Sequence, residues 1–243
     1  MNLNLLVSLG AAIALITPPS ALAAETGPCE ARDLGFAQPA AGWVHRPLSK
    51  TKRDTVYTVS KEGDVAVLRA EAKASASAYL APFKTPIAVP TSLSWRWKTD
   101  ALVKGADNRV KDKEDAPLRV MLAFDGDVAS LPDDEQTRFK RAKRLFGKEL
   151  PYALLMYVWS DQVAPGTVIP SAHSSQVKMI AVASGSAGLG SWQSQKRNIA
   201  EDYKRAWGAV PGKLLGVAVM TDTDNTGQAA SGYYADIRLE CAG

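Results

Sequence analysis

Cysteine, histidine and aromatic residues are scarce in this sequence: its 243 residues include 2 Cys and 2 His, and 7% are aromatic. The two cysteines form no Cys-x-x-Cys pair, which excludes a catalytic dithiol. The histidines, His45 and His173, stand in loop-like sequence, and no Gly-x-Ser-x-Gly motif occurs in a strand–turn–helix context. Zinc-finger, RNA-recognition and glycine-rich phosphate motifs are also missing. The sequence therefore gives little support to catalysis and favours a non-catalytic function.

A long apolar run occurs only at the N-terminus, where residues 3–24 carry no charged side chain. Pro18-Pro19 interrupts this run before it reaches the roughly 20 residues that a membrane-spanning helix needs. Ala21-Leu22-Ala23 then offers the small-x-small pattern of a signal peptidase site. We therefore expect residues 1–24 to be a signal peptide, with a membrane anchor as the alternative. Residues 25–243 are expected to form one periplasmic or secreted domain, with no membrane span left after cleavage.

The two cysteines lie near the ends of this expected domain, Cys29 just after the cleavage site and Cys241 two residues before the last residue. An even number of cysteines in an exported chain is typical of disulfide-bonded proteins. We therefore predict a Cys29–Cys241 disulfide, which would join the two ends of the domain. Two free thiols are the alternative.

Positive charge is in modest excess, with a net charge of +4, and six Lys and Arg residues crowd between residues 138 and 148. Such a run suits anionic lipid, nucleic acid or acidic polysaccharide, but it is more commonly the solvated face of a helix. Because the protein is expected to leave the cytoplasm and carries no recognition motif, we expect no nucleic-acid partner.

Short apolar runs with turn residues between them predict a β-rich fold. Residues 56–59 and 65–72 flank a turn that contains Gly63, and they predict a hairpin. Strict alternation places Trp95 and Trp97 on one face of a strand. The other segments with strand patterns are residues 118–124, 152–159, 177–183, 214–221 and 232–240. About eight strands that do not alternate with helices favour an antiparallel β-sandwich.

Two segments have helical spacing instead. Asp133 to Gly147 carries a modest apolar stripe, and Gly147 is suited to the C-cap. Asn198 to Gly208 begins with a good N-cap residue and ends at a glycine. The predicted fold class is therefore all-β with minor helices, an antiparallel β-sandwich with two short helices.

Several segments together match one protein family. They are Leu93–Trp97, Glu114–Val120, Tyr157–Trp159, Arg197–Tyr203, Thr221–Gly227 and Tyr233–Ile237. Through them the chain resembles the bacterial exported proteins grouped as domain of unknown function 3047 (DUF3047), over roughly residues 35–240. The resemblance implies a jelly-roll sandwich of the galactose-binding type, a class that includes many carbohydrate-binding modules. The family's activity is not established, so the resemblance implies no particular reaction.

Oxygen-bearing side chains alternate at Asp222, Asp224 and Asn225, directly after a predicted strand. Such a pattern can converge on a hard cation, and calcium takes six to eight oxygen ligands. Only three or four are visible here, and Tyr233 stands where an EF-hand loop would need Glu. Calcium on Asp222 and Asp224 is therefore a minor alternative to a polar turn, and no other cofactor is expected.

Charged residues also occur in the middle of apolar strands. Arg96 alternates with two tryptophans, Arg119 alternates with aliphatic residues, and Asp236 lies between Ala235 and Ile237. Such charges need each other, water or a ligand, because an unpaired buried charge costs several kcal/mol. We expect Arg96, Arg119, Asp222, Asp224 and Asp236 to converge on one concave patch. The alternative is a ladder of cross-strand salt bridges.

Aromatic side chains in an exported sandwich can stack on sugar rings, which makes Trp159 and Tyr234 candidates. For Trp159, a place in the core is the more common alternative. Asp115, Asp222 and Asp236 are the carboxylates that a glycoside hydrolase on this fold would use first. The predicted ligand-binding residues are Arg96, Asp115, Arg119, Trp159, Asp222, Asp224, Asn225, Tyr234 and Asp236. The favoured function is non-catalytic binding of a polysaccharide or another envelope component. The alternatives are a carbohydrate-active hydrolase and a structural envelope protein.

Overall fold

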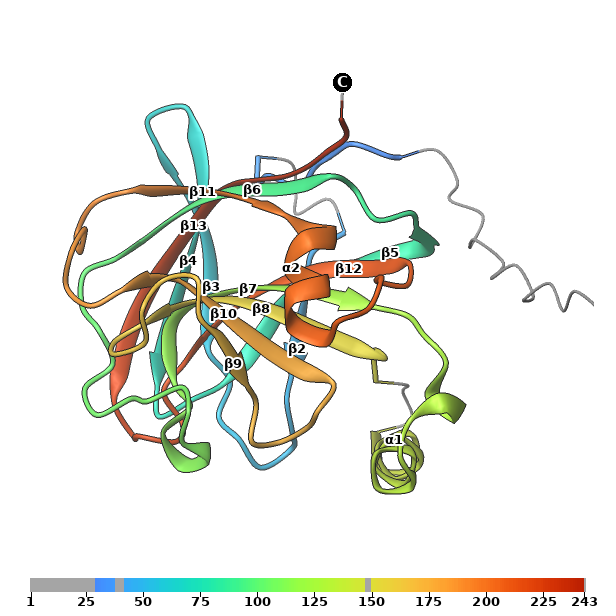
Figure 1. Ribbon diagram of the computed structural model, residues 1–243. Helices are drawn as coiled ribbons and strands as arrows, with labels where there is room; N and C mark the ends of the chain where they lie inside the picture. Colours follow the sequence, from blue (N-terminus) through green and yellow to red (C-terminus); the bar gives the residue numbers. More distant parts are fainter. Residues whose placement is uncertain (1–28, 38–41, 147–149, 243) are drawn as a thin grey trace, which may run out of the picture.

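The computed structural model describes residues 29–37, 42–146 and 150–242 (Figure 1). The predicted signal peptide, residues 1–24, and Gly147 lie outside the described residues. Two β-sheets face each other across a hydrophobic core, and two α-helices are added to them. The prediction of an all-β sandwich with two short helices is therefore confirmed.

One sheet has six strands in the order β11-β6-β13-β4-β3, with β1 paired to β13. Its strands are β1 (Arg32–Asp33), β3 (Val56–Glu62), β4 (Val65–Lys73), β6 (Ser92–Thr99), β11 (Gln193–Asn198) and β13 (Ala229–Glu240). The predicted hairpin is the antiparallel pair β3–β4, and Gly63 in its turn has φ = 60°, which favours glycine. Gly63 thus explains why the chain reverses between these strands.

The second sheet has seven strands in the order β2-β5-β12-β7-β8-β10-β9. They are β2 (Val44–Pro47), β5 (Ser77–Ile87), β7 (Ala116–Phe124), β8 (Ala153–Ser160), β9 (Val168–Pro170), β10 (Val177–Ser184) and β12 (Leu214–Asp222). The pair β8–β10 is parallel and the other pairs of this sheet are antiparallel. Short 3₁₀-helices, η1 (Lys111–Lys113) and η2 (Val128–Ser130), precede and follow β7.

The core lies between the two sheets, as the alternation of the strands predicts. Trp95 and Trp97 of β6 are 1% and 0% exposed, and they meet Tyr157 and Trp159 of β8. On β7, Leu118, Val120 and Leu122 point into the same core. Each strand therefore presents its other set of side chains to the outside of the sandwich.

The outer face of the seven-stranded sheet is apolar as well. A second cluster of buried residues, separate from the core, includes Met121, Met156, Met179 and Met220. A strand that is apolar on both faces reads as a nearly continuous apolar run, which explains the run at residues 152–159. The outer face is thus apolar enough that we expect it to be shielded from water.

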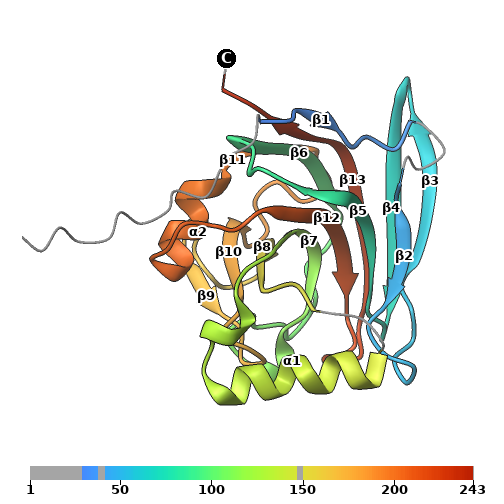
Figure 2. The ribbon, with the colours of Figure 1, turned by 90° about the vertical axis from the view of Figure 1, so that its right-hand side faces the viewer.

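Helix α1 (Asp133–Phe146) lies on this outer side, at the bottom of the molecule in Figures 1 and 2. Its Glu135 accepts hydrogen bonds from the hydroxyl and backbone N–H of Ser175, both 2.8 Å, and from the Ser174 hydroxyl at 3.1 Å. Burial alone would raise the pKa of Glu135, but these donors outweigh it and lower that pKa below its usual value. The first half of α1 is therefore fixed to the loop between β9 and β10.

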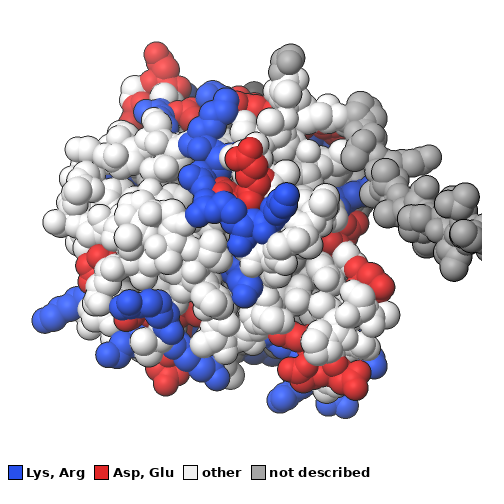
Figure 3. All heavy atoms as spheres, in the orientation of Figure 1, with Lys and Arg blue, Asp and Glu red and all other residues white. Residues whose placement is uncertain are grey.

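Helix α2 (Ile199–Trp207) follows β11 directly and forms as predicted. The Asn198 side chain accepts from the Glu201 N–H at 3.1 Å, and Gly208 ends the helix with φ = 71°. Figure 3 shows Lys and Arg side chains gathered over β11 and α2 around acidic groups. By sequence, Arg197 belongs to β11 and Arg205 to α2, and both pair with the buried carboxylate of Asp202. This charged surface is therefore partly neutralised by its own ion pairs.

The predicted disulfide is confirmed: Cys29 and Cys241 are bonded, with Cα atoms 5.9 Å apart. Next to it, the Leu34 N–H donates to the Ile237 carbonyl at 2.8 Å. Within the described ranges, none of the helices is long and apolar enough to cross a membrane.

Candidate functional site

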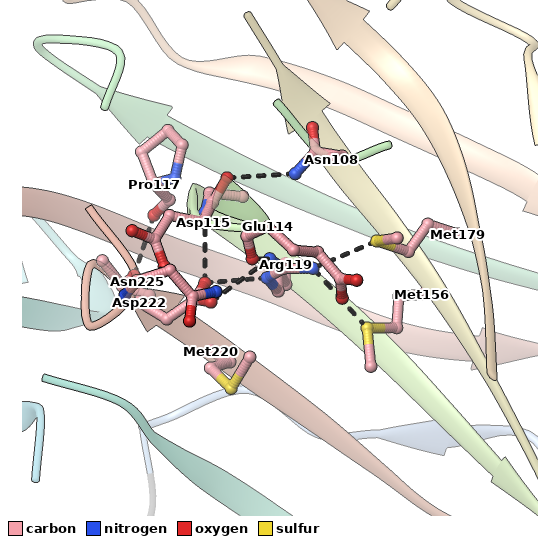
Figure 4. Close-up of polar contacts among 12 residues, drawn as sticks. Asn108, Glu114, Asp115, Pro117, Arg119, Met156, Met179, Met220, Asp222 and Asn225 are labelled. Carbon is pink, nitrogen blue, oxygen red and sulfur yellow. Dashed lines mark hydrogen bonds and ion pairs between the residues drawn. The ribbon is translucent and has the colours of Figure 1, made fainter. Parts of the chain in front are cut away.

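A buried ion pair joins Arg119 of β7 to Asp222 at the end of β12 (Figure 4). Arg119 Nε donates to Asp222 Oδ1 at 2.7 Å and Nη2 donates to Oδ2 at 3.2 Å. Both residues lie on the outer face of the seven-stranded sheet, yet they are only 1% and 4% exposed. Arg119 can lie in an apolar strand because its counter-charge, Asp222, is on the neighbouring strand.

The rest of the Arg119 guanidinium has unusual partners. Nη2 also donates to the Glu114 carbonyl, whereas Nη1 faces the sulfur atoms of Met179 at 3.2 Å and Met156 at 3.7 Å. Thioether sulfur is a weak acceptor, so this end of the cation is poorly solvated. Asp222 is therefore the main counter-charge of Arg119.

Burial raises the pKa of Asp222 to about 6, although Arg119 beside it acts in the opposite direction. At neutral pH the carboxyl is mostly ionised and the ion pair is formed. For Arg119, burial lowers the pKa, but Asp222 outweighs that effect and the net shift is upward. The arginine therefore keeps its positive charge at neutral pH.

Asp115 and Asp224 lie close to Asp222, and one carboxylate oxygen of each of the three lies within 4.8 Å of the others. Each carboxylate has a protein partner. Asp115 accepts the backbone N–H groups of Asn225 and Thr226, at 3.2 and 2.7 Å, and Asp224 pairs with Lys52. The turn that follows β12 is thus held by Asp115 and Lys52 from other segments rather than by bonds from its own Asp and Asn side chains to its own backbone. Calcium on Asp222 and Asp224 stays a prediction.

The predicted convergence of five charged residues on one patch is wrong. Arg96 and Asp236 pair with each other, Nε to Oδ2 at 2.5 Å, on the outer face of the six-stranded sheet. Arg119 and Asp222 belong to the other sheet, with Asp224 just after it. The set thus separates into two cross-strand salt bridges on opposite faces of the sandwich.

The two aromatic residues that were predicted to contact a ligand do not lie at the surface. Trp159 and Tyr234 are both 0% exposed and lie in the core between the sheets. Trp159 Nε1 donates to the Gly185 carbonyl at 3.0 Å. Neither ring is therefore available to stack on a ligand at the surface, because the strand face that each occupies is the inner one. Asp115 and Asn225 remain beside Asp222 and Asp224 at one end of the sheet.

A groove of about 670 Å³ lies on the outer face of the seven-stranded sheet, next to this polar cluster. Its apolar floor consists of paired residues from β5, β12, β7 and β8. One row is Leu80, Ala218, Met121 and Met156, and the next row is Pro82, Gly216, Ala123 and Leu154. The volume lies in the range of pockets that bind small molecules.

Gly216 is needed in this floor, because a Cβ atom there would lie 2.7 Å from the Ala81 carbonyl oxygen. The backbones of β5 and β12 approach each other closely at this point, where their register shifts. Position 216 of the floor therefore accepts only glycine, because any larger residue would push β12 away from β5.

Charged and polar residues also line the groove, and the sequence predicted only some of them. Arg119, Asp222, Asp224 and Asn225 were predicted, whereas Arg46, Lys52, Glu114 and Asp125 were not. Arg46 is half-buried at the end of a row that runs Arg46, Ala78, Met220, Arg119 across four strands. Among the Lys and Arg side chains that line the groove, that of Arg46 alone has no hydrogen bond or ion pair within the described part of the chain.

The chain is similar to the xyloglucanase domain of NopAA, a type three effector from Sinorhizobium fredii, solved in complex with cellobiose. The identity is 8%, the TM-score is 0.39, and the match covers 81% of this chain and 92% of that chain. No curated protein sequence matches this chain at a significant level.

A family model, described as "Protein of unknown function (DUF3047)", matches residues 41–238. The match spans both sheets from β2 to nearly the end of β13, and it includes every residue that lines the groove. It confirms the resemblance seen in the strand motifs of the sequence. The chain therefore belongs to the DUF3047 family.

Proposed function

We propose that this protein is an exported, non-catalytic domain that binds a component of the cell envelope in the groove of its seven-stranded sheet. The observation that carries the proposal is the groove itself. The groove has a floor of apolar side chains. An apolar, concave surface is more often a binding site than a part of the ordinary protein surface. The disulfide and the leader-like residues 1–24 support an extracytoplasmic location.

The carboxylates beside the groove support binding rather than turnover. Asp222 is held by Arg119, Asp224 by Lys52, and Asp115 by two backbone N–H groups. A general acid or nucleophile must be able to contact its substrate, whereas these carboxylates already form ion pairs or hydrogen bonds within the protein.

One observation favours a second candidate, a carbohydrate-active hydrolase. Asp222 and Glu114 both line the groove, and burial raises the pKa of Asp222 to about 6. Carboxyl groups with raised pKa values in a cleft are common at the active sites of glycosidases. Release of reducing ends from polysaccharide by the wild type, and its loss in Glu114→Gln, would favour this candidate.

The test of binding compares a filled groove with an open one. Mature protein is incubated with envelope lipid and polysaccharide fractions, re-isolated by gel filtration, and its bound small molecules are identified by mass spectrometry. Ala218→Trp places a large ring in the middle of the floor and should abolish retention. Val59→Trp adds the same ring to an exposed site on β3 of the other sheet, and it should retain ligand like the wild type. Retention of nothing, or equal retention by both variants, would overturn the proposal.

A further inference from the structure

The apolar floor offers no hydrogen-bonding side chain to a ligand. Its two rows contain only aliphatic, methionine, proline and glycine residues, and they cross four strands. Three steps between strands of about 4.8 Å each make the floor about 14 Å wide. Sugar hydroxyls placed there would lose water without gaining partners, at a cost of about 1–3 kcal/mol each. An alkyl chain loses nothing on such a floor and fits the adaptable methionine side chains.

The groove does not end at the sheet. A second cavity of about 220 Å³ lies under α1 and is lined by Val128, Phe139 and Leu150, together with Lys140 and Lys143. Val128 and Leu150 line both cavities, so the two adjoin. An extended apolar ligand longer than the floor can therefore continue beneath α1.

The opposite end of the groove carries a cation without a counter-charge. Arg46 is half-buried and lines the groove beyond Ala78 and Met220. The two other cationic Lys and Arg residues of the lining are paired, Lys52 with Asp224 and Arg119 with Asp222. A guanidinium beside an apolar surface forms bidentate, charge-assisted hydrogen bonds to a carboxylate or phosphate.

Asp125, by contrast, lines the groove just past the C-terminal end of β7, beyond the second row of the floor. Asp125 repels an anionic group at its end of the groove, and Arg46 attracts one at the other end. The competing cations are Lys140 and Lys143 of the adjoining cavity, which the test below must distinguish from Arg46.

Building on the binding function proposed above, we propose that the ligand is an amphipath with a long alkyl chain and an anionic head group. The chain lies on the apolar floor and continues toward α1, and the head group is bound by Arg46. A free fatty acid and an anionic phospholipid share this chemistry.

The test measures equilibrium binding of palmitate by calorimetry, with hexadecanol as the neutral chain of equal length. Arg46→Gln should weaken palmitate binding by about tenfold to a hundredfold, as expected for a lost charged hydrogen bond, and leave hexadecanol within twofold. Arg46→Lys should recover part of the loss. Lys84→Gln, an exposed change on β5 outside the groove, is the matched control. Equal losses for both ligands, or a loss in Lys140→Gln instead, would overturn the placement of the head group.

Two further arms separate the sources and the classes of ligand. Mass spectrometry of protein re-isolated from phosphatidylglycerol vesicles reports whether a phospholipid is taken up, and palmitate binding alone indicates a free fatty acid. A panel of oligosaccharides serves as the glycan arm. Oligosaccharide binding that Ala218→Trp abolishes, without palmitate binding, would overturn the amphipath and keep the binding function. If neither class binds, both proposals fail. Ala123→Phe repeats the groove-filling test should Ala218→Trp fail to fold.

Discussion

The hydroxyl of Tyr234 donates a hydrogen bond to the backbone carbonyl of Met220, at 2.7 Å, across the space between the two sheets. The same oxygen accepts from the Arg119 N–H at 3.3 Å and lies 2.9 Å from Thr221 Oγ1. Burial raises the pKa of this phenol above its usual value, so it stays protonated. One side chain of β13 therefore ties together β12 and β7 directly beneath the groove.

Tyr234→Phe should destabilise the protein by about 1–3 kcal/mol, because buried backbone groups of Met220 and Arg119 lose their partner. Urea unfolding followed by circular dichroism measures the change. Tyr233→Phe is the matched control: that neighbouring residue faces the other side of β13, where its ring contacts Lys98. An equal loss in both variants would contradict a special role for the inner hydroxyl.

Arg119→Met should cost about 3–5 kcal/mol of unfolding free energy, since Asp222 is then left buried without its counter-charge. This result differs from the expectation for an exposed binding arginine, whose loss leaves the melting temperature unchanged. The double variant Arg119→Met/Asp222→Leu should regain most of the loss, because it buries no unpaired charge. A double variant as unstable as the sum of the two single variants would show that the two side chains act independently.

The ion pair should also give the protein a specific dependence on pH. The pKa of Asp222 is raised to about 6 in the folded protein, above its usual 3.8, so the folded state holds this proton more tightly than the unfolded state does. The stability contributed by this carboxyl is therefore full below about pH 4 and is lost as the pH rises through about 6. The wild type minus Asp222→Asn difference in unfolding free energy should fall between pH 4 and pH 7. A difference that rises over this range would mean that Arg119 holds the pKa of Asp222 low instead.

Reduction of the Cys29–Cys241 disulfide should destabilise the domain by about 2–5 kcal/mol, because the bond closes a loop with a sequence separation of 212 in the unfolded chain. Thermal melts with and without reductant measure this loss. Cys29→Ser/Cys241→Ser should melt at the temperature of the reduced wild type and should not respond to reductant. A wild type that is insensitive to verified reduction would argue that local contacts alone hold the ends.

Arg96 and Arg119 show what alternation in the sequence can predict and what it cannot. Alternation predicted correctly that both arginines lie outside the core. It says nothing about which sheet a strand joins, because that depends on pairing between segments far apart in the chain. β6 pairs with β13 and β11, whereas β7 pairs with β12 and β8, so the two arginines lie on opposite faces.

The groove was predictable only in part, for the same reason. Four of the five methionines gather on its sheet, and each lies at an outward position of a strand, but four separate strands must pair before they form a surface. Arg46 follows His45, which the sequence placed in a loop-like segment, and the four residues of β2 are too few to show a period. The helices, by contrast, are indicated by spacing within a few turns of chain, and both α1 and α2 lie where they were predicted. The caps of α2 at Asn198 and Gly208 were predicted as well.

The joined ends of the domain have a practical consequence for measuring ligands. Cys29 is bonded to Cys241, and the chain ends at the top of the molecule in both ribbon views, whereas α1 lies at the bottom. Helix α1 lines the cavity that adjoins the groove. A biotin group attached at the C-terminus therefore holds captured molecules on a biosensor chip by the end of the molecule that lies away from α1. Immobilised protein should then bind an analyte with the same affinity as protein free in solution.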